Sequence, residues 1–231
     1  AGYLIGPGVD LTGADLTGLD LSGADLSGAD LTGASLTGLT SGLIVGEPSL
    51  PSGYQIIGGY LIGPGVDLTG ADLTEMDFTG LDLTGADLTG VDLTSADLTG
   101  AILTAVTSGS IVGIPTLPSG YQIIGGYLIG PGVDLRSSDL AGADLTGADL
   151  TGADLRHSNL TGADLTNADL SGANLRSTDL TGADLTGAYL TEADLTGVTS
   201  GSIVGTPTLP SGTLLMAGYL IGPGADLQSF D

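Results

Sequence analysis

Large apolar residues recur at every fifth position along most of the chain. In the first stretch they are Leu11, Leu16, Leu21, Leu26, Leu31 and Leu36. A helix turns every 3.6 residues and a strand alternates every two, so neither keeps residues five apart on one face. The chain can bury these side chains together only by turning a corner in each repeat. The pattern therefore predicts a coil that stacks on itself, a β-solenoid.

The positions between the apolar residues are also regular, because the commonest repeat is Ala-Asp-Leu-Thr-Gly. Glycine tolerates the backbone angles of a turn, so we expect the corners at Gly13, Gly18 and their equivalents. The polar Asp and Thr are expected on the outer surface. The repeats form blocks of six, eight and thirteen, which are centred on Leu11 to Leu36, Leu68 to Leu103 (with Phe78 the one exception) and Leu135 to Leu195.

The Ala-(Asp/Asn)-Leu-x-x motif resembles the pentapeptide-repeat family, and this likeness covers most of the chain. The resemblance implies an all-β fold, a right-handed parallel β-helix with four sides and one pentapeptide on each side. It also implies that the central Leu and the small residue two positions before it point inward. Since that small residue is mostly Ala here, as at Ala14 and Ala24, the interior is expected to be a Leu/Ala core.

Three inserts of equal length interrupt the repeats, at residues 40–66, 107–133 and 199–225. Each contains two short apolar runs around a two-residue turn, as in Tyr54 to Ile62 with Gly58-Gly59 between them, which predicts a β-hairpin. The leucines that flank each insert are 32 residues apart, which is not a multiple of five, so we expect the insert to leave the register of the coil. The predicted order is a half insert (1–8), block (9–39), insert (40–66), block (67–106), insert (107–133), block (134–198), insert (199–225) and a new block (226–231).

The two ends of the chain are candidates for contacts between copies. Residues 217–227 nearly duplicate residues 1–11, so either the chain is a window of a longer array or its ends complete each other between molecules. The third insert also departs from the others at residues 213–218, which fits a cap or an interface and fits neutral drift equally well. The candidate interaction residues at the ends are Tyr3, Leu4, Ile5, Leu214, Leu215, Met216, Tyr219 and Leu220.

The chain is strongly acidic, with three Arg, no Lys and 27 acidic residues, which gives a net charge of −24. Nucleic-acid binding needs clustered Lys or Arg, so nucleic acid is excluded as a partner. No apolar stretch is long enough to span a bilayer, so membrane insertion is not expected either. The absence of cysteine excludes disulfides and thiolate metal sites.

The three arginines, Arg136, Arg156 and Arg176, are spaced by 20 residues, which is four pentapeptides. In a four-sided coil they stack in one column, and stacked like charges repel each other. Two hypotheses explain which negative charges offset this repulsion. Carboxylates on the same surface, such as Asp139 and Asp179, pair with the arginines, or the arginines bind carboxylates of another copy. His157 beside this column is assigned no role.

The Asp residues are expected to form columns as well. Crowding of like charges would raise the pKa of these carboxyls and make the protein more stable as the pH falls. The columns could hold Ca²⁺ diffusely, but the sequence predicts no specific metal site and no cofactor.

Nothing in the sequence forms a recognisable catalytic constellation, because there is one His, no Cys and no phosphate-binding loop. The leading hypothesis is a non-enzymatic structural protein that self-associates into an extracellular filament or surface fibre. The resemblance supplies an alternative, an acidic rod that mimics DNA and binds a type II topoisomerase. A third hypothesis is ice binding through columns of threonine hydroxyls such as Thr146, Thr166 and Thr186.

Overall fold

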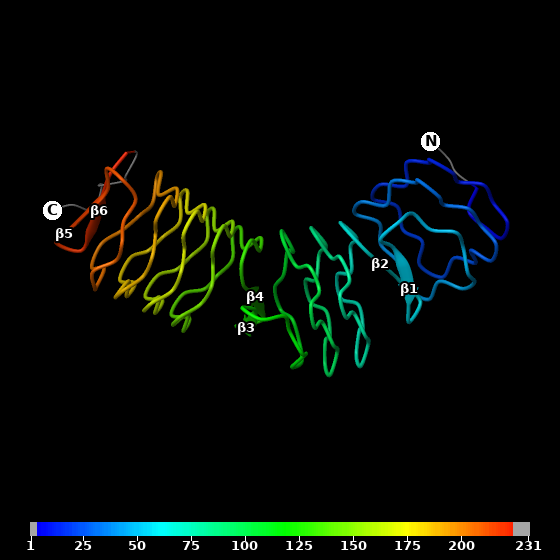
Figure 1. Cartoon of the computed structure of the whole chain (residues 1–231), viewed down its shortest axis with the longest axis horizontal. Helices are drawn as coiled ribbons and strands as arrows, with labels where there is room; N and C mark the ends of the chain where they lie inside the picture. Colours follow the sequence, from blue (N-terminus) through cyan, green and yellow to red (C-terminus); the bar gives the residue numbers. More distant parts are fainter. Residues whose placement is uncertain (1–3, 224–231) are drawn as a thin grey trace. The chain divides into compact units, whose positions relative to one another are not determined.

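The computed structural model of the protein describes residues 4–223. The chain divides into two compact units, residues 1–119 and 120–231, and the boundary falls inside the second insert. Each unit is a stack of coils that are wound from very short extended segments (Figure 1). Among the described residues there is no helix, and the regular strands are β1 (Gln55–Ile57), β2 (Tyr60–Ile62), β3 (Gln122–Ile124), β4 (Tyr127–Ile129), β5 (Leu214–Met216) and β6 (Tyr219–Ile221).

The coils are four-sided, as the sequence predicts. Parallel bridges join residues that are 20 positions apart, so four pentapeptides complete one turn. At one such bridge the backbone N–H of Asp30 donates to Val9 O (2.9 Å), and the N–H of Leu11 donates to Asp30 O (2.7 Å). The same pairing recurs on every side of the coil, for example at Asp15–Ser35, Asp20–Thr40, Asp134–Asp154, Asp139–Asn159, Asp144–Asp164 and Asp149–Asp169. The fold is therefore a β-helix solenoid.

The interior is the expected Leu/Ala core. The central leucines of the third block, such as Leu145 and Leu165, are completely buried, and so are small residues such as Ala153 and Ala168. Phe78, the one exception to Leu, is also buried. Burial of a Leu side chain contributes about 1.5–3 kcal/mol, so the regular ladder of leucines is the main stabilising feature of the coils.

A typical corner combines a residue in the left-handed conformation with a hydrogen bond from a backbone N–H to an Asp carboxylate. The residue two positions after the central Leu has a positive φ, for example 65° at Gly13 and 58° at Ser137. The carboxylate before the Leu accepts a hydrogen bond from the backbone N–H two residues later, as Asp10 does from Thr12 (2.9 Å). The Asp residue therefore holds the corner in place as well as facing water.

The inserts follow the coil further than the sequence analysis predicts. In the first insert Thr40 and Val45 still pair 20 positions back, and Ser49 then pairs with Asp30, only 19 positions back. The insert therefore keeps the register of the coil as far as Val45, contrary to the expectation, and leaves it between Val45 and Ser49. The corner around Gly46 is one residue shorter than an ordinary corner, and the other inserts show the same spacing of 19 at Asp97–Thr116 and Tyr189–Thr208.

The second part of each insert is the predicted antiparallel hairpin. In the first insert Gln55 pairs with Ile62 and Ile57 with Tyr60, around a turn in which Gly58 and Gly59 both have positive φ. The third insert keeps the same register, although Ala217 takes the first turn position, with φ 50°. The changed sequence at residues 213–218 therefore leaves the hairpin geometry intact.

The first hairpin docks onto the coil that precedes it. The N–H of Ile44 donates to Gly59 O (2.9 Å), and the N–H of Leu61 donates to the hydroxyl of Ser41 (2.8 Å). Ser41 is buried at an inward position where the repeats have Leu. Thr40 pairs directly with Asp67 on the far side of the insert, so one side of the solenoid stays continuous while the hairpin is inserted.

Candidate interaction surface

The three arginines stack in one column of the second unit, as their spacing predicts. The N–H of Ser137 donates to Arg156 O (3.0 Å), and the N–H of His157 donates to Arg176 O (3.1 Å), so consecutive arginines lie on adjacent coils. Their side chains are 53%, 39% and 53% exposed in chain order. We call Arg136, Arg156 and Arg176 the arginine ladder.

The ladder is paired within the molecule, but with different carboxylates from those that the sequence analysis names. Arg136 binds Asp134 through Nε (2.8 Å), and Arg156 binds Asp154 in the same way. The candidate partners Asp139 and Asp179 do not form these ion pairs, because Asp134 and Asp154 lie on the same side of the coil as the arginines that follow them. Instead, Asp139 accepts a hydrogen bond from the side chain of Asn159 one coil away (3.0 Å).

Arg176 differs from the other two arginines because Asn174 replaces the Asp two residues before it. Its guanidinium reaches Asp194 on the next coil through Nη1, at 3.4 Å. The side-chain oxygen of Asn174 accepts a hydrogen bond from the backbone N–H of Arg176 (3.3 Å). Arg176 therefore has the weakest internal pairing of the three.

Ion pairing shifts the pKa of Arg136, Arg156 and Asp154. The hydrogen bond to Asp134 raises the pKa of the Arg136 guanidinium, and the hydrogen bond to Asp154 does the same for Arg156. Partial burial raises the pKa of Asp154, but the hydrogen bonds and the charge of Arg156 outweigh it, so the net pKa is lowered. Arg136, Arg156 and Asp154 are therefore all charged at neutral pH.

Corner hydrogen bonds, rather than repulsion between columns, set the pKa of many exposed carboxyls. The hydroxyl of Thr12 and its N–H lower the pKa of Asp10, and Thr79 does the same for Asp77. At Asp30 the charge of Asp10 raises the pKa, but the hydrogen bonds from Thr32 prevail. The expectation of raised pKa values is therefore wrong for these carboxyls.

His157 occupies a corner position with φ 60° and is exposed. Among residues 4–223, no group of three or more His, Cys, Asp or Glu residues is placed to hold a metal ion. A search of the same residues for a helix long and apolar enough to cross a membrane finds none.

The candidate residues at the two ends have different environments. Leu4, Leu214 and Met216 are exposed by 84%, 60% and 55%, so these side chains are accessible, whereas Leu220 is buried. Ile5, Leu215 and Tyr219 are half-buried. Tyr3 lies outside the described residues.

Sequence reasoning missed a Tyr–Gly contact that closes the hairpin in two inserts. The Tyr54 hydroxyl donates to Pro64 O (2.7 Å), and its ring covers Gly63 so closely that a Cβ there would overlap the ring. Tyr121 makes the same contact with Gly130 and Pro131 O. The signal was present in the sequence, because a Tyr precedes each of the two hairpins and a Gly follows them nine residues later.

Replacing the covered glycine is expected to open this contact. Gly63→Ala should destabilise the first unit by about 1–3 kcal/mol, the usual range for overpacking, because the new methyl group displaces the ring. Urea unfolding followed by circular dichroism measures the change. In a Tyr54→Ala background the same substitution should have little further effect, and equal losses in both backgrounds would show that the ring is not the cause.

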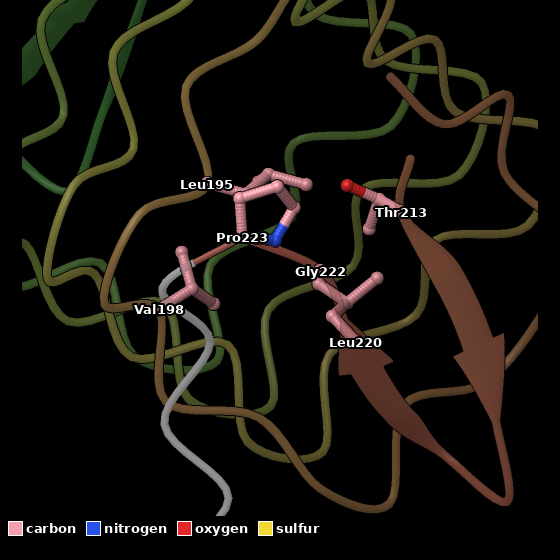
Figure 2. Close-up of a pocket in the computed structure, with 6 residues that line it drawn as sticks. All are labelled: Leu195, Val198, Thr213, Leu220, Gly222 and Pro223. Atoms are coloured by element: carbon pink, nitrogen blue, oxygen red, sulfur yellow. The ribbon is translucent and has the colours of Figure 1, made fainter. Parts of the chain in front are cut away.

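The third insert has Thr213 in place of the tyrosine. Figure 2 shows a small cavity at this place, with Thr213, Leu220 and Gly222 on the hairpin side and Leu195 and Val198 on the side of the preceding coil. Pro223 completes the lining. The smaller threonine side chain leaves space that the tyrosine ring takes up in the other inserts, so the third hairpin is packed less tightly.

Comparison with models of protein families identifies one family. The family model described as pentapeptide repeats matches eight copies, in residues 8–38, 67–104, 132–167 and 158–197. No curated protein matches the chain.

Among solved structures, HetL from the cyanobacterium Nostoc sp. strain PCC 7120, a pentapeptide repeat protein involved in heterocyst differentiation regulation, is 29% identical. That match covers 91% of this chain and 90% of HetL, with a TM-score of 0.25. Rfr23 from the cyanobacterium Cyanothece 51142 is 25% identical over 62% of this chain and 90% of its own, with a TM-score of 0.25. QnrB1, a plasmid-mediated fluoroquinolone resistance protein, is 16% identical over 96% and 90%, with a TM-score of 0.31.

Proposed function

We propose, from the premise that this chain belongs to the pentapeptide repeat family, that it is a non-enzymatic structural protein whose coils associate with those of other copies. Proteins of this family are generally structural or binding proteins rather than enzymes. In our proposal the associated copies form a filament or fibre outside the cell or at its surface. The proposal rests on the unpaired backbone groups and partly exposed apolar residues of the first described coil.

In the first coil of the described residues, backbone groups on one edge are not paired with any other described coil. In the described part of the chain, the N–H groups of Asp10 and Asp20 have no hydrogen-bond partner, whereas the equivalent N–H of Asp30 donates to Val9 O. Ala14 and Leu19 on this coil are half-buried, but the equivalent residues one coil further, Ala34 and Leu39, are buried. The edge therefore has both the backbone groups and the apolar residues that a further coil would cover.

A coil of a second molecule can satisfy this edge with the interactions that the solenoid already uses. Unpaired edges are templates for association, and each added coil hides backbone groups and small apolar side chains from water. Filament growth by this route needs only the kind of backbone pairing already present, because neighbouring pentapeptide coils are joined by the same parallel bridges. The association is therefore expected to be end to end.

A positive charge on the open edge should prevent this association. Ala14→Lys places an ammonium group where the next coil would pack, and an inward-pointing Lys is a common means of blocking strand edges. We expect at least a tenfold loss of association, which corresponds to about 1.4 kcal/mol. Sedimentation velocity over a range of concentrations, together with negative-stain electron microscopy, measures it.

The matched control is Thr12→Lys, which adds the same charge at an exposed corner of the same coil. This variant should assemble like the unmodified protein. If the unmodified protein stays monomeric at every concentration, or if Ala14→Lys assembles equally well, the proposal is wrong. A monomeric protein would direct the search to the acidic rod that binds a topoisomerase and to ice binding.

A further inference from the structure

The arginine ladder carries all the cationic charge of a chain whose net charge is −24. The column beside it contains Asp134, Asp154, Asn174 and Asp194, which are linked by bridges from coil to coil. Three arginines thus face three carboxylates, so this strip is close to neutral. Two acidic molecules repel each other when most of their surfaces approach, and the ladder is a place where they do not.

The ladder retains hydrogen-bonding capacity after its internal pairing. Within residues 4–223, Nη1 of Arg136 and of Arg156 makes no hydrogen bond, and Arg176 uses only Nη1. The guanidinium groups are also substantially exposed. Arginine donors in a fixed planar arrangement favour carboxylate oxygens, so the open positions are suited to acidic groups of another surface.

One column of carboxylates in the described coils matches the ladder in length and spacing. Asp144, Asp164 and Asp184 follow each other on three consecutive coils, with no other residue type between them. In the other described columns a run of Asp stops after one or two coils at a Thr, Ser, Asn, Ile, Val or Tyr, for example at Ser49, Val112 and Tyr189. The column and the ladder have the same repeat, one residue per coil, so three ion pairs can form in register.

We propose that the arginine ladder binds the column Asp144–Asp164–Asp184 of a second copy, side by side with it. This inference rests on the proposed self-association and adds a lateral contact to the end-to-end one. Each arginine keeps its internal carboxylate and shares its free N–H groups with the second copy. Among the described residues the column forms no ion pair, so its carboxylates are available to the free N–H groups of the ladder.

The experiment separates this contact from the open edge by using the Ala14→Lys background, in which end-to-end association is blocked. In that background, the lateral contact should give salt-sensitive dimers, and larger lateral assemblies at higher concentration, in sedimentation velocity. Either Arg156→Glu or Asp164→Lys should weaken the dimer by about tenfold or more, since both disrupt the central pair of three exposed ion pairs.

Mixing the two variants provides the decisive measurement. The Arg156→Glu protein still has an intact carboxylate column, and the Asp164→Lys protein still has an intact ladder, so the mixture should recover association that neither variant shows alone. Asp149→Lys, on the neighbouring column, makes the same charge change and should leave the dimer unaffected. Circular dichroism and melting temperature check that all variants fold.

Two results would overturn the inference: a strictly monomeric Ala14→Lys protein, or a dimer that is insensitive to both ladder and column substitutions. Neither result decides the end-to-end proposal, which is judged by comparing assembly of the unmodified and Ala14→Lys proteins. The two ideas can therefore fail independently.

Discussion

Substituting Ala for Gly46 should destabilise the first unit far more than the same substitution at an ordinary corner. Gly46 is where the first insert removes one residue from the coil, and its backbone runs so close to the preceding coil that a Cβ would lie 2.5 Å from Ser27 N. The contact is with backbone, which cannot rotate away as a side chain can. Gly46 also has a φ of 93°, which L side chains rarely adopt.

The expected loss combines two effects. Strain in an unusual backbone conformation amounts to about 1–3 kcal/mol, and overpacking to about 1–3 kcal/mol. A loss of about 2–6 kcal/mol for Gly46→Ala follows from these two ranges, measured as a shift in the urea midpoint or the melting temperature. Gly113→Ala should behave alike, because Gly113 has the same φ and approaches Thr94 N as closely.

Gly100→Ala is the matched control for these substitutions. Gly100 lies at an ordinary corner of the same unit, with φ 68° and no atom within 4 Å of the position that a new methyl group would take. The chain itself places Ala105 at such a corner, with φ 57°. We expect a loss of only about 1 kcal/mol for the control. Equal losses at Gly46 and Gly100 would mean that the close approach to Ser27 is unimportant.

The period of five was sufficient to predict a solenoid, whereas the four-sided β-helix was implied by the resemblance to the pentapeptide-repeat family. Leu residues five apart can share a core only if the chain turns regularly, and the positions of Arg136, Arg156 and Arg176 agree with four sides per coil. The hairpins were predictable for a similar local reason, since Gly58-Gly59 between two short apolar runs permits the positive φ of a tight turn.

The course of the inserts could not be predicted by counting residues. A spacing of 32 between leucines implies a loss of register, but the structure keeps three sides of the coil paired and shortens that turn from 20 to 19 residues. The need for glycine at position 46 becomes clear only from the structure, where its backbone lies against the backbone of Ser27 on the preceding coil. The recurrence of Val-Gly at Val45-Gly46, Val112-Gly113 and Val204-Gly205 was the available signal.

The choice of partners in the arginine ladder depended on side-chain direction. Spacing alone could not distinguish Asp139 from Asp134 as the partner of Arg136, because both lie within one pentapeptide of it. The corner between Arg136 and Asp139 sends their side chains to different sides of the coil. A rule derived from the repeat would now assign each arginine to the residue two positions before it, and Arg176 to the next coil because Asn174 carries no charge.

Acid should destabilise the protein, because the corner hydrogen bonds lower the pKa of many Asp residues below the ordinary value of 3.8. A carboxyl with a lowered pKa in the folded state binds protons less readily than in the unfolded chain. Its contribution to stability is complete above the unfolded pKa and is lost as the pH falls through the folded pKa. The melting temperature should therefore be nearly constant down to about pH 5 and fall steeply below about pH 4.

One corner allows the cause to be tested directly. At Asp77 the hydroxyl of Thr79 is the largest influence on the carboxyl, followed by the Thr79 N–H, which donates to Oδ1 (2.8 Å). Thr79→Val removes the hydroxyl and keeps the N–H, so the pKa of Asp77 should rise towards its ordinary value. NMR titration of the Asp77 carboxyl carbon measures this change.

Thr79→Ser is the control, because serine already supplies the same hydrogen bond to Asp20 from Ser22 and lowers its pKa. The serine variant should keep the low pKa of Asp77, while the valine variant loses it. If like-charge crowding dominated instead, the pKa of Asp77 would lie above 3.8 in the unmodified protein and the melting temperature would rise between about pH 5 and about pH 3. That outcome would show that repulsion between columns, and not the corner hydrogen bond, controls the acid response of the solenoid.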